Sequence, residues 1–207
     1  MPLVSASDET RLYYELEGSD SRPVLMFSNS LGTNFRMWHG QVSAFADRYR
    51  ILRYGSRGHG KSDAPPGEYS IERLGEDVVN LLDALNLDRI HFCGLSKGGM
   101  GGMWLGIHAS HRFKTLALIP SAYLPPTEMW NSRIVEIKRK GISSFVDGIL
   151  RRWFTSDFIE SGSRDLDSVR QQFLNTPVEG YTACCAAIRD MDLREQSSEI
   201  STPTLVI

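Results

Sequence analysis

The sequence has little cysteine, no long apolar run and no strong excess of charge of either sign. Its three cysteines include the neighbouring pair Cys184 and Cys185, and none has the spacing of metal ligands. An odd number of cysteines, a residue type that is usually buried, predicts free thiols in a reducing cytoplasm. Neither a disulfide-stapled scaffold nor a structural metal site is therefore expected.

Membrane and nucleic-acid roles are also disfavoured. Apolar runs such as residues 116–119 are far shorter than the roughly 20 residues needed to cross a bilayer. The first residues lack the basic start, apolar centre and cleavage site of a secretory signal, so we expect a cytoplasmic protein. The formal net charge of -2 gives no reason to expect nucleic acid or an anionic membrane as a partner.

The sequence does contain short apolar runs, which recur along a chain of 207 residues. Such runs are typical of strands covered on both faces, as in a parallel sheet. Helical patterns separate most of them, which predicts an α/β fold with helices on both faces of a mostly parallel sheet. The predicted strands are 24–28, 50–54, 89–93, 115–119 and 204–207, with an earlier antiparallel strand at 12–16.

The clearest helical pattern covers residues 71–85 and follows Ser70, a plausible N-cap. Its apolar residues fall on one stripe, and its acidic residues, Asp77 among them, are predicted to face solvent. After Pro125-Pro126 the alternation of strands and helices stops, and residues 127–195 have helical patterns only. We therefore predict a core at 1–126, a helical cap inserted at 127–195 and a return to the core at 196–207.

Residues 94–98 read Gly-Leu-Ser-Lys-Gly between a predicted strand and a helix of small residues expected at 99–108. In the G-x-S-x-G pattern a sharp strand-to-helix turn holds the serine clear of the sheet, and the glycines avoid clashes of a Cβ. The helix N-terminus favours a developing negative charge. We predict that Ser96 is a nucleophile; the alternative is a tight turn with an idle serine.

A second loop, residues 28–32, leaves the predicted strand at 24–27 and precedes a helix that starts near Met37. Such a loop is positioned to aim a backbone N–H at the nucleophile. We predict an oxyanion hole formed by the N–H groups of Leu31 and Lys97, the latter being the residue after Ser96. The alternative is an ordinary connecting turn.

These segments resemble the α/β-hydrolase family, and most of all the 3-oxoadipate enol-lactonases of the β-ketoadipate route of aromatic-compound catabolism. The resemblance implies a serine hydrolase without metal or cofactor. Its substrate would be a small lactone with a free carboxylate, opened through an acyl-enzyme at Ser96. The segments that carry the resemblance are 28–33 with Met37-Trp38, 57–63, 94–100 and 121–124.

The family places its catalytic acid after the strand that matches 204–207 and its histidine further on, so the resemblance implies that both lie beyond Ile207. Serine without a base is a poor nucleophile. We therefore expect negligible turnover from residues 1–207 alone, with the last strands and helix of the fold missing. Leu205 and Val206 should form an exposed sheet edge, open to self-association or to a complementing C-terminal fragment.

Other positions depart from the family pattern. Gly55 replaces the usual Asp, and Lys97 replaces a residue that is commonly uncharged. The side chain of Lys97 is expected either to favour an oxyanion or to point into solvent. The pair Gly101-Gly102 should weaken the helix behind the serine by roughly 1 kcal/mol per glycine relative to alanine.

The five histidines of the chain are alternative bases. A base must come within about 3 Å of the serine hydroxyl. His59, in a glycine-rich turn, is the least unfavourably placed, but surface or packing roles are expected for the whole set. The set is His39, His59, His91, His108 and His111.

The predicted cap helix at 128–140 places Trp130 and Arg133 on one mostly apolar face. If this face covers the pocket above Ser96, Arg133 would pair with the substrate carboxylate and Trp130 would cover the ring. The alternative is an arginine that snorkels at the edge of a packed helix. Residues 153–154 are a second candidate lining patch, or simply core of the cap.

Two other functions stay open. A carboxylesterase or a carbon–carbon bond hydrolase of the same fold would keep Ser96 and change only the cap, because fold alone does not set the substrate. A non-catalytic fragment that binds a ligand or a partner is the second alternative, because no base is evident in the chain.

Overall fold

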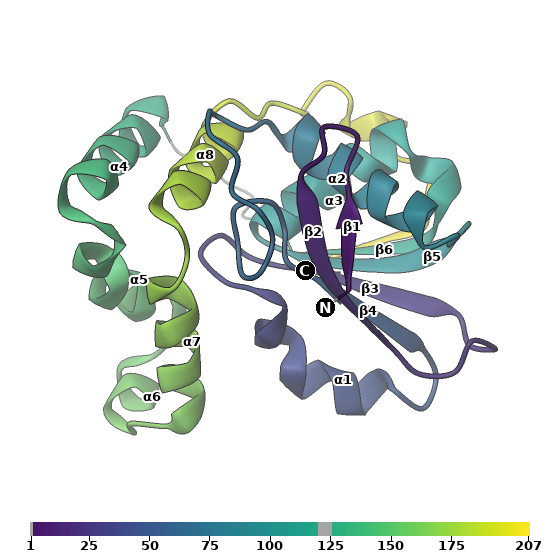
Figure 1. The fold of residues 1–207 in the computed structure, drawn as a ribbon, viewed down its shortest axis with the longest axis horizontal. Helices are drawn as coiled ribbons and strands as arrows, with labels where there is room; N and C mark the ends of the chain where they lie inside the picture. Colours follow the sequence, from purple (N-terminus) through teal and green to yellow (C-terminus); the bar gives the residue numbers. More distant parts are fainter. Residues whose placement is uncertain (1, 120–125) are drawn as a thin grey trace.

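The computed structural model describes residues 2–119 and 126–207. Its strands form one sheet in the order β1-β2-β4-β3-β5-β6-β7 (Figure 1). Strand β2 pairs antiparallel with both of its neighbours, β1 and β4. All other neighbouring strands pair parallel. This confirms the predicted α/β class. The strands are β1 (Leu3–Ser5), β2 (Arg11–Glu17), β3 (Val24–Ser28), β4 (Arg50–Tyr54), β5 (Ile90–Leu95), β6 (Phe113–Ile119) and β7 (Thr204–Val206).

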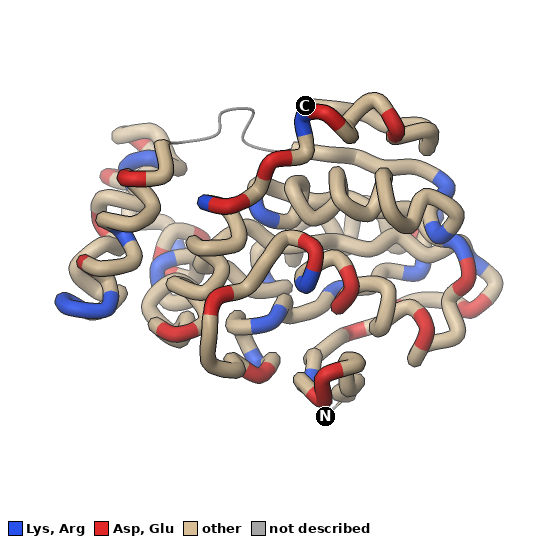
Figure 2. The backbone as a smooth tube through the Cα atoms, turned by 90° about the horizontal axis from the view of Figure 1, so that it is seen from above, with Lys and Arg blue, Asp and Glu red and all other residues tan. Residues whose placement is uncertain are grey.

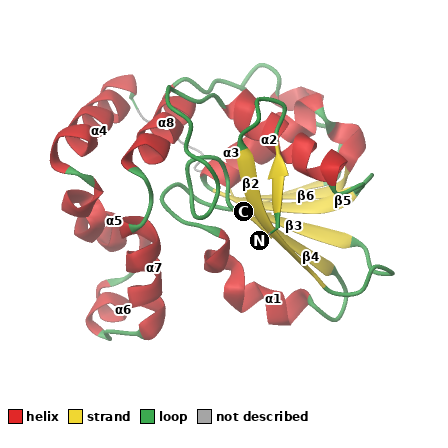
Figure 3. Ribbon diagram, viewed as in Figure 1, coloured by secondary structure: helices red, strands yellow, loops and turns green. Residues whose placement is uncertain are grey.

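Helices cover both faces of the sheet (Figure 3). In β3, Val24 and Met26 belong to an apolar cluster with the helices of one face, whereas Leu25 and Phe27 belong to a cluster on the other face. A strand covered on both sides must be apolar throughout, which explains the uninterrupted run. The helices on one face are α2 (Ile71–Ala84) and α3 (Lys97–His108), and on the other α1 (His39–Phe45) and the 3-10 helix η1 (Phe35–Trp38).

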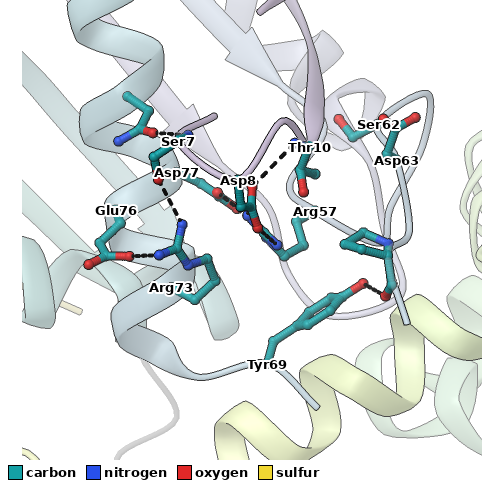
Figure 4. Close-up of polar contacts among 12 residues, drawn as sticks. Ser7, Asp8, Thr10, Arg57, Ser62, Asp63, Tyr69, Arg73, Glu76 and Asp77 are labelled. Carbon is teal, nitrogen blue, oxygen red and sulfur yellow. Dashed lines mark hydrogen bonds and ion pairs between the residues drawn. The ribbon is translucent and has the colours of Figure 1, made fainter. Parts of the chain in front are cut away.

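Helix α2 begins as predicted, with the Oγ atom of Ser70 accepting a hydrogen bond from the N–H of Arg73 at 3.0 Å. The prediction that Asp77 faces solvent is wrong, because only 1% of this residue is exposed. Its carboxylate accepts hydrogen bonds from Arg57 at 2.8 and 2.6 Å (Figure 4). Helical periodicity did not reveal this partner, since it lies on another segment.

The polypeptide between β6 and β7 contributes only helices to the described residues. In Figure 1, α4 to α7 form a lobe beside the sheet and α8 lies between this lobe and the sheet. These helices occupy the region that the sequence assigns to a cap. They are α4 (Thr127–Lys140), α5 (Val146–Trp153), α6 (Ser156–Glu160), α7 (Arg164–Leu174) and α8 (Val178–Arg189), with 3-10 helices η3 (Ile142–Phe145) in the cap and η2 (Ser110–Arg112) and η4 (Ser197–Glu199) elsewhere.

Charged residues of both signs are distributed along the whole chain. Lys and Arg are interspersed with Asp and Glu along the backbone in Figure 2. None of the helices in the described part of the chain has the length and apolarity to span a bilayer. At the end of the sheet, Leu205 and Val206 in β7 are 59% and 66% exposed, so the expected apolar edge is present.

Candidate active site

Ser96 occupies the turn between β5 and α3, with a φ of 52°. A positive φ is uncommon for a residue with a side chain and marks local strain. The turn is held to the sheet by a hydrogen bond of 2.7 Å from the N–H of Ser96 to the carbonyl of Ile119 in β6. Helix α3 begins at Lys97, two residues before the predicted start at 99, because the chain reverses within Ser96 itself.

The two flanking glycines are required by close backbone contacts. A Cβ atom on Gly94 would lie 2.3 Å from the carbonyl oxygen of Gly98, and a Cβ atom on Gly98 would lie 2.4 Å from the carbonyl oxygen of Ser28. Such separations are far below van der Waals contact, so the elbow and the end of β3 approach each other only without side chains. The spacing of the predicted motif therefore matches its geometry.

The two glycines of the pair in α3 differ in how closely they are packed. A Cβ atom on Gly102 would lie 2.5 Å from Leu118 and 2.7 Å from Phe92, so this glycine allows α3 to pack closely on the sheet. A Cβ atom on Gly101 would meet nothing within 4 Å. Only Gly101 is thus a helix-weakening glycine without a packing reason.

The loop after β3 forms a tight turn at residues 30–33. The N–H of Thr33 donates to the carbonyl of Ser30 at 3.4 Å, and Gly32 has a φ of 75°, as the third residue of a type II turn requires. Neither the N–H of Leu31 nor that of Lys97 donates to an acceptor within residues 2–119 and 126–207. Both predicted oxyanion donors are therefore without a protein partner among the described residues.

The side chain of Lys97 lies away from this site, and the prediction that it points into solvent is wrong. The residue is only 2% exposed, and its Nζ atom donates a hydrogen bond to the Oγ atom of Ser56. Burial lowers the pKa of this amine, because the interior disfavours the charged form. The residues next to Lys97 in the sequence do not reveal Ser56 as its partner, because Ser56 lies 41 residues away.

Position 55 is also shaped by a close contact. A Cβ atom on Gly55 would lie 2.9 Å from the carbonyl oxygen of His59 and 2.8 Å from the Oγ atom of Ser62. An aspartate at this position would therefore require the turn over residues 55–62 to shift.

His59 is not placed to act as a base on Ser96. Its Nε2 atom accepts a hydrogen bond from the N–H of Gly32 at 2.9 Å, so the lone pair of this nitrogen is already used. Burial lowers the pKa of the imidazole well below its usual value, and the nearby Lys97 lowers it further. In the described part of the chain, no histidine lines either of the two cavities that reach Ser96.

The first of these cavities joins the elbow to the cap. Its volume is about 150 Å³. Ser96 and Leu31 from the core meet Trp130 and Arg133 of α4 there, so four of the predicted site residues share one cavity. The guanidinium carbon of Arg133 lies 4.6 Å from the centroid of the Trp130 ring, which is a cation–π distance. Arg133 is half-buried rather than solvated, as its place on an apolar face predicts.

A second cavity, of about 590 Å³, reaches Ser96 from another side. Arg152 and Trp153 of the cap line both cavities, as Ser30 and Ser96 do on the side of the core. Trp153 was a predicted lining residue, whereas no role was predicted for Arg152. Nothing in the local pattern distinguishes Arg152 from Arg151, because only the position of α5 beside the elbow does so.

The thiols have the predicted state. Cys184 and Cys185 are free and fully buried, and Cys93 is free and half-buried. Among residues 2–119 and 126–207, no three His, Cys, Asp or Glu side chains are grouped as a metal site would require. Residues 121–124, which carry part of the resemblance, lie outside the described residues.

Comparisons with known proteins agree with this geometry. Residues 23–205 match the family model described as alpha/beta hydrolase fold. The chain is 38% identical to 3-oxoadipate enol-lactonase 2 of Acinetobacter baylyi over 202 residues, which are 97% of this chain and 76% of that protein.

Solved structures are similar over nearly the whole chain. The enol-lactonase from Burkholderia xenovorans superimposes with a TM-score of 0.95 at 39% identity, covering 99% of this chain and 80% of that one. A hydrolase from Pseudomonas aeruginosa gives a TM-score of 0.96 at 42% identity, covering 99% and 78%.

Proposed function

The chain belongs to the α/β-hydrolase family, and on that basis we propose that it opens a small, carboxylate-bearing enol-lactone through an acyl-enzyme at Ser96. The observation that carries the proposal is the shared cavity of Ser96 and Arg133. This cavity places a hydroxyl at a strained elbow beside a half-buried cation. The names of the enol-lactonase relatives support the substrate class.

The proposed reaction begins with attack of the Ser96 Oγ atom on the ring carbonyl. The carbonyl oxygen becomes an oxyanion, which the N–H groups of Leu31 and Lys97 would stabilise. The general base takes the proton of the Ser96 hydroxyl during attack. Collapse breaks the ring C–O bond, and the base returns this proton to the leaving enolate, which becomes the 3-oxo group. Water then hydrolyses the acyl ester and frees Ser96, so that the product is 3-oxoadipate when the lactone is 3-oxoadipate enol-lactone.

The size and charge of the cavity support this substrate class. A cavity of about 150 Å³ is known to admit a ligand the size of benzene, so a single small ring fits the scale of the space beside Ser96. Arg133 and Arg152 both line this space and offer planar donors to a carboxylate. The indole of Trp130 offers a flat apolar surface to the ring.

We propose further that neither the general base nor the catalytic acid is among residues 1–207, so that these residues alone have negligible turnover. No histidine among the described residues lines either cavity that reaches Ser96, which supports this proposal. His59 uses its Nε2 lone pair for Gly32, as described above.

A chimera tests both proposals. The C-terminal segment of Acinetobacter baylyi enol-lactonase 2 is fused after Ile207, and enol-lactone hydrolysis is measured for the chimera, for residues 1–207 and for the chimera with Ser96→Ala. We expect turnover by the unsubstituted chimera and by neither of the other two proteins. Turnover by residues 1–207, or by the Ser96→Ala chimera, would contradict the proposed machinery.

A second candidate function is a carboxylesterase, and the cavity of about 590 Å³ beside Ser96 favours it. Its lining includes the apolar side chains of Met37, Trp38, Phe154 and Val169, which suit an extended alcohol group. Comparing kcat/KM of the chimera on enol-lactone and on neutral aryl esters decides between the two. Higher kcat/KM on the esters would favour the esterase.

We also propose that the apolar edge at β7 associates, either with a second copy or with a C-terminal fragment, because Leu205 and Val206 are exposed there. Sedimentation of residues 1–207 and of a Val206→Lys variant tests this. The parent chain should self-associate and the variant should not. The parent chain is also sedimented with the added C-terminal segment of enol-lactonase 2. A parent chain that stays monomeric by itself and does not bind this segment would contradict the proposal.

A further inference from the structure

We propose that His59 is a positioning residue for the oxyanion hole: it holds the turn at residues 30–33 by accepting a hydrogen bond from the N–H of Gly32. The inference rests on the proposed hydrolase function of Ser96. It assigns a task to a buried histidine that the reaction steps do not otherwise use.

Both ring nitrogens of His59 have protein partners. Nε2 lies 2.9 Å from the amide nitrogen of Gly32, and Nδ1 lies 3.2 Å from the carbonyl oxygen of Arg57. An amide N–H can only donate and a carbonyl can only accept, so the proton resides on Nδ1 and Nε2 carries the lone pair. The ring thus links the turn at 57–60 to the oxyanion turn, with no exposure to solvent.

The support behind the ring is rigid. Arg57 donates to both oxygens of Asp77 at 2.8 and 2.6 Å and to both oxygens of Asp8 at 2.7 and 3.1 Å (Figure 4). The N–H of His59 also donates to the carbonyl of Ser56 at 2.9 Å. Charge-assisted, bidentate pairs of this kind restrict the orientation of a side chain. His59 is therefore held by a segment that is itself tied to α2 and to the turn between β1 and β2.

The cap closes the oxyanion turn from the other side. A Cβ atom on Gly32 would lie 2.7 Å from the ring of Phe173 in α7 and 3.1 Å from that of Tyr181 in α8. The Gly32 peptide is therefore confined by aromatic rings and is tied to His59 by its N–H. Neither the core nor the cap alone confines this peptide.

The peptide between Leu31 and Gly32 decides the shape of the turn. Type I and type II turns differ by a flip of this central peptide, and glycine at the third position permits both forms. The hydrogen bond to His59 selects one orientation. A flip changes ψ of Leu31 and reverses its carbonyl. Relaxation of the turn around the reversed carbonyl would displace the neighbouring N–H of Leu31, the proposed oxyanion donor, and a misplacement of about 1 Å lowers rates by up to about 100-fold.

A direct test uses nitrogen NMR on the 207-residue chain with ¹⁵N label. We expect a scalar coupling across the hydrogen bond between the Gly32 amide nitrogen and Nε2 of His59, and an Nε2 shift typical of an unprotonated nitrogen. A proton on Nε2, or no coupling with both signals resolved, would overturn the proposal. The readout does not depend on turnover, so it separates this inference from the proposed reaction.

A kinetic test uses the lactone-hydrolysing chimera with His59→Asn. We expect kcat to fall roughly 10- to 100-fold with KM changed less than about 2-fold, because transition-state stabilisation is lost and substrate binding is kept. The matched control is Cys184→Ala, which removes a thiol 4.0 Å from Nδ1 but leaves the Gly32 bond intact. Its kcat should change less than about 2-fold.

Two results of the kinetic test would overturn the proposal: an equal fall in kcat for both variants, or a rise in KM alone for His59→Asn. Hydrogen exchange at the Gly32 amide is measured on the same proteins. It should accelerate in folded His59→Asn and not in Cys184→Ala. If His59→Asn fails to fold, the coupling in the unsubstituted chain decides.

Discussion

The sheet and the cap contribute to the cavity at Ser96 by different kinds of contact. The sheet side is built from backbone: the strained elbow, the turn at 30–33 and glycines at which an added Cβ atom would lie less than 3 Å from neighbouring backbone. The cap side is built from side chains, chiefly Arg133, Trp130 and Tyr181. A backbone arrangement tolerates few substitutions, whereas side chains are exchanged without moving the chain. We therefore expect the core to set the reaction and the cap to set the substrate.

The largest effect should come from the charged support of the core. Asp77→Asn leaves the buried guanidinium of Arg57 with only Asp8 as a charged partner, and breaking a buried pair typically lowers the free energy of unfolding by about 3–5 kcal/mol. The matched change in the cap is Lys140→Ala, which removes an exposed pair with Glu136 and should cost less than about 0.5 kcal/mol. Urea unfolding of both variants is the measurement. Similar losses of unfolding free energy in the two variants would contradict the expected difference between the core and the cap.

A smaller effect is expected from a methyl group at the elbow. Gly98→Ala forces a Cβ atom against the backbone of Ser28 and should lower the free energy of unfolding by about 1–3 kcal/mol. Gly101→Ala, one turn along the same helix, meets no atom within 4 Å and should raise it by roughly 0.5–1 kcal/mol. Thermal unfolding gives both values. The two changes in the free energy of unfolding should have opposite signs. A stabilising Gly98→Ala would show that the elbow does not contact the backbone of Ser28 tightly.

The cap should show its effect on substrate choice rather than on stability. Arg133→Ala in the chimera should raise KM for the anionic lactone roughly 10- to 100-fold, because a hydrogen bond to a charged group is lost. KM for a neutral ester should change less than about 2-fold. Arg139→Ala, an exposed arginine on the same helix, is the control and should change neither. Equal effects on the two substrates would leave Arg133 a packing residue only.

The smallest effect concerns pH and Asp8. Hydrogen bonds from Arg57 hold the pKa of this carboxyl well below its usual value. A depressed pKa stabilises the fold above the unfolded value of about 3.9, and that contribution is lost as the pH falls through the folded pKa. Asp8→Asn should therefore lower Tm slightly at pH 6 and converge with the parent chain towards pH 2. A difference in Tm between Asp8→Asn and the parent chain that grows on acidification would contradict a lowered pKa of Asp8.

Sequence patterns predicted the parts of this protein that depend on neighbours along the chain. Strands β2 to β7, the cap of α2 at Ser70 and the elbow at Ser96 follow from periodicity and glycine spacing, whereas the short strand β1 was not predicted. The prediction that Asp77 faces solvent and the solvent alternative for Lys97 were wrong, because the partners of these side chains lie far away in sequence. Arg152 was missed for the same reason.

By itself, the sequence determined the fold class, the strained position of Ser96 and the apolar face that carries Arg133, since each is set by local spacing. Only the tertiary structure decided which groups meet. It buried Lys97 against Ser56, used the His59 lone pair for Gly32 and brought α4 and α5 over the elbow. The physical reason is that hydrogen bonds, ion pairs and cavities depend on distances in space, which periodicity along one element does not record.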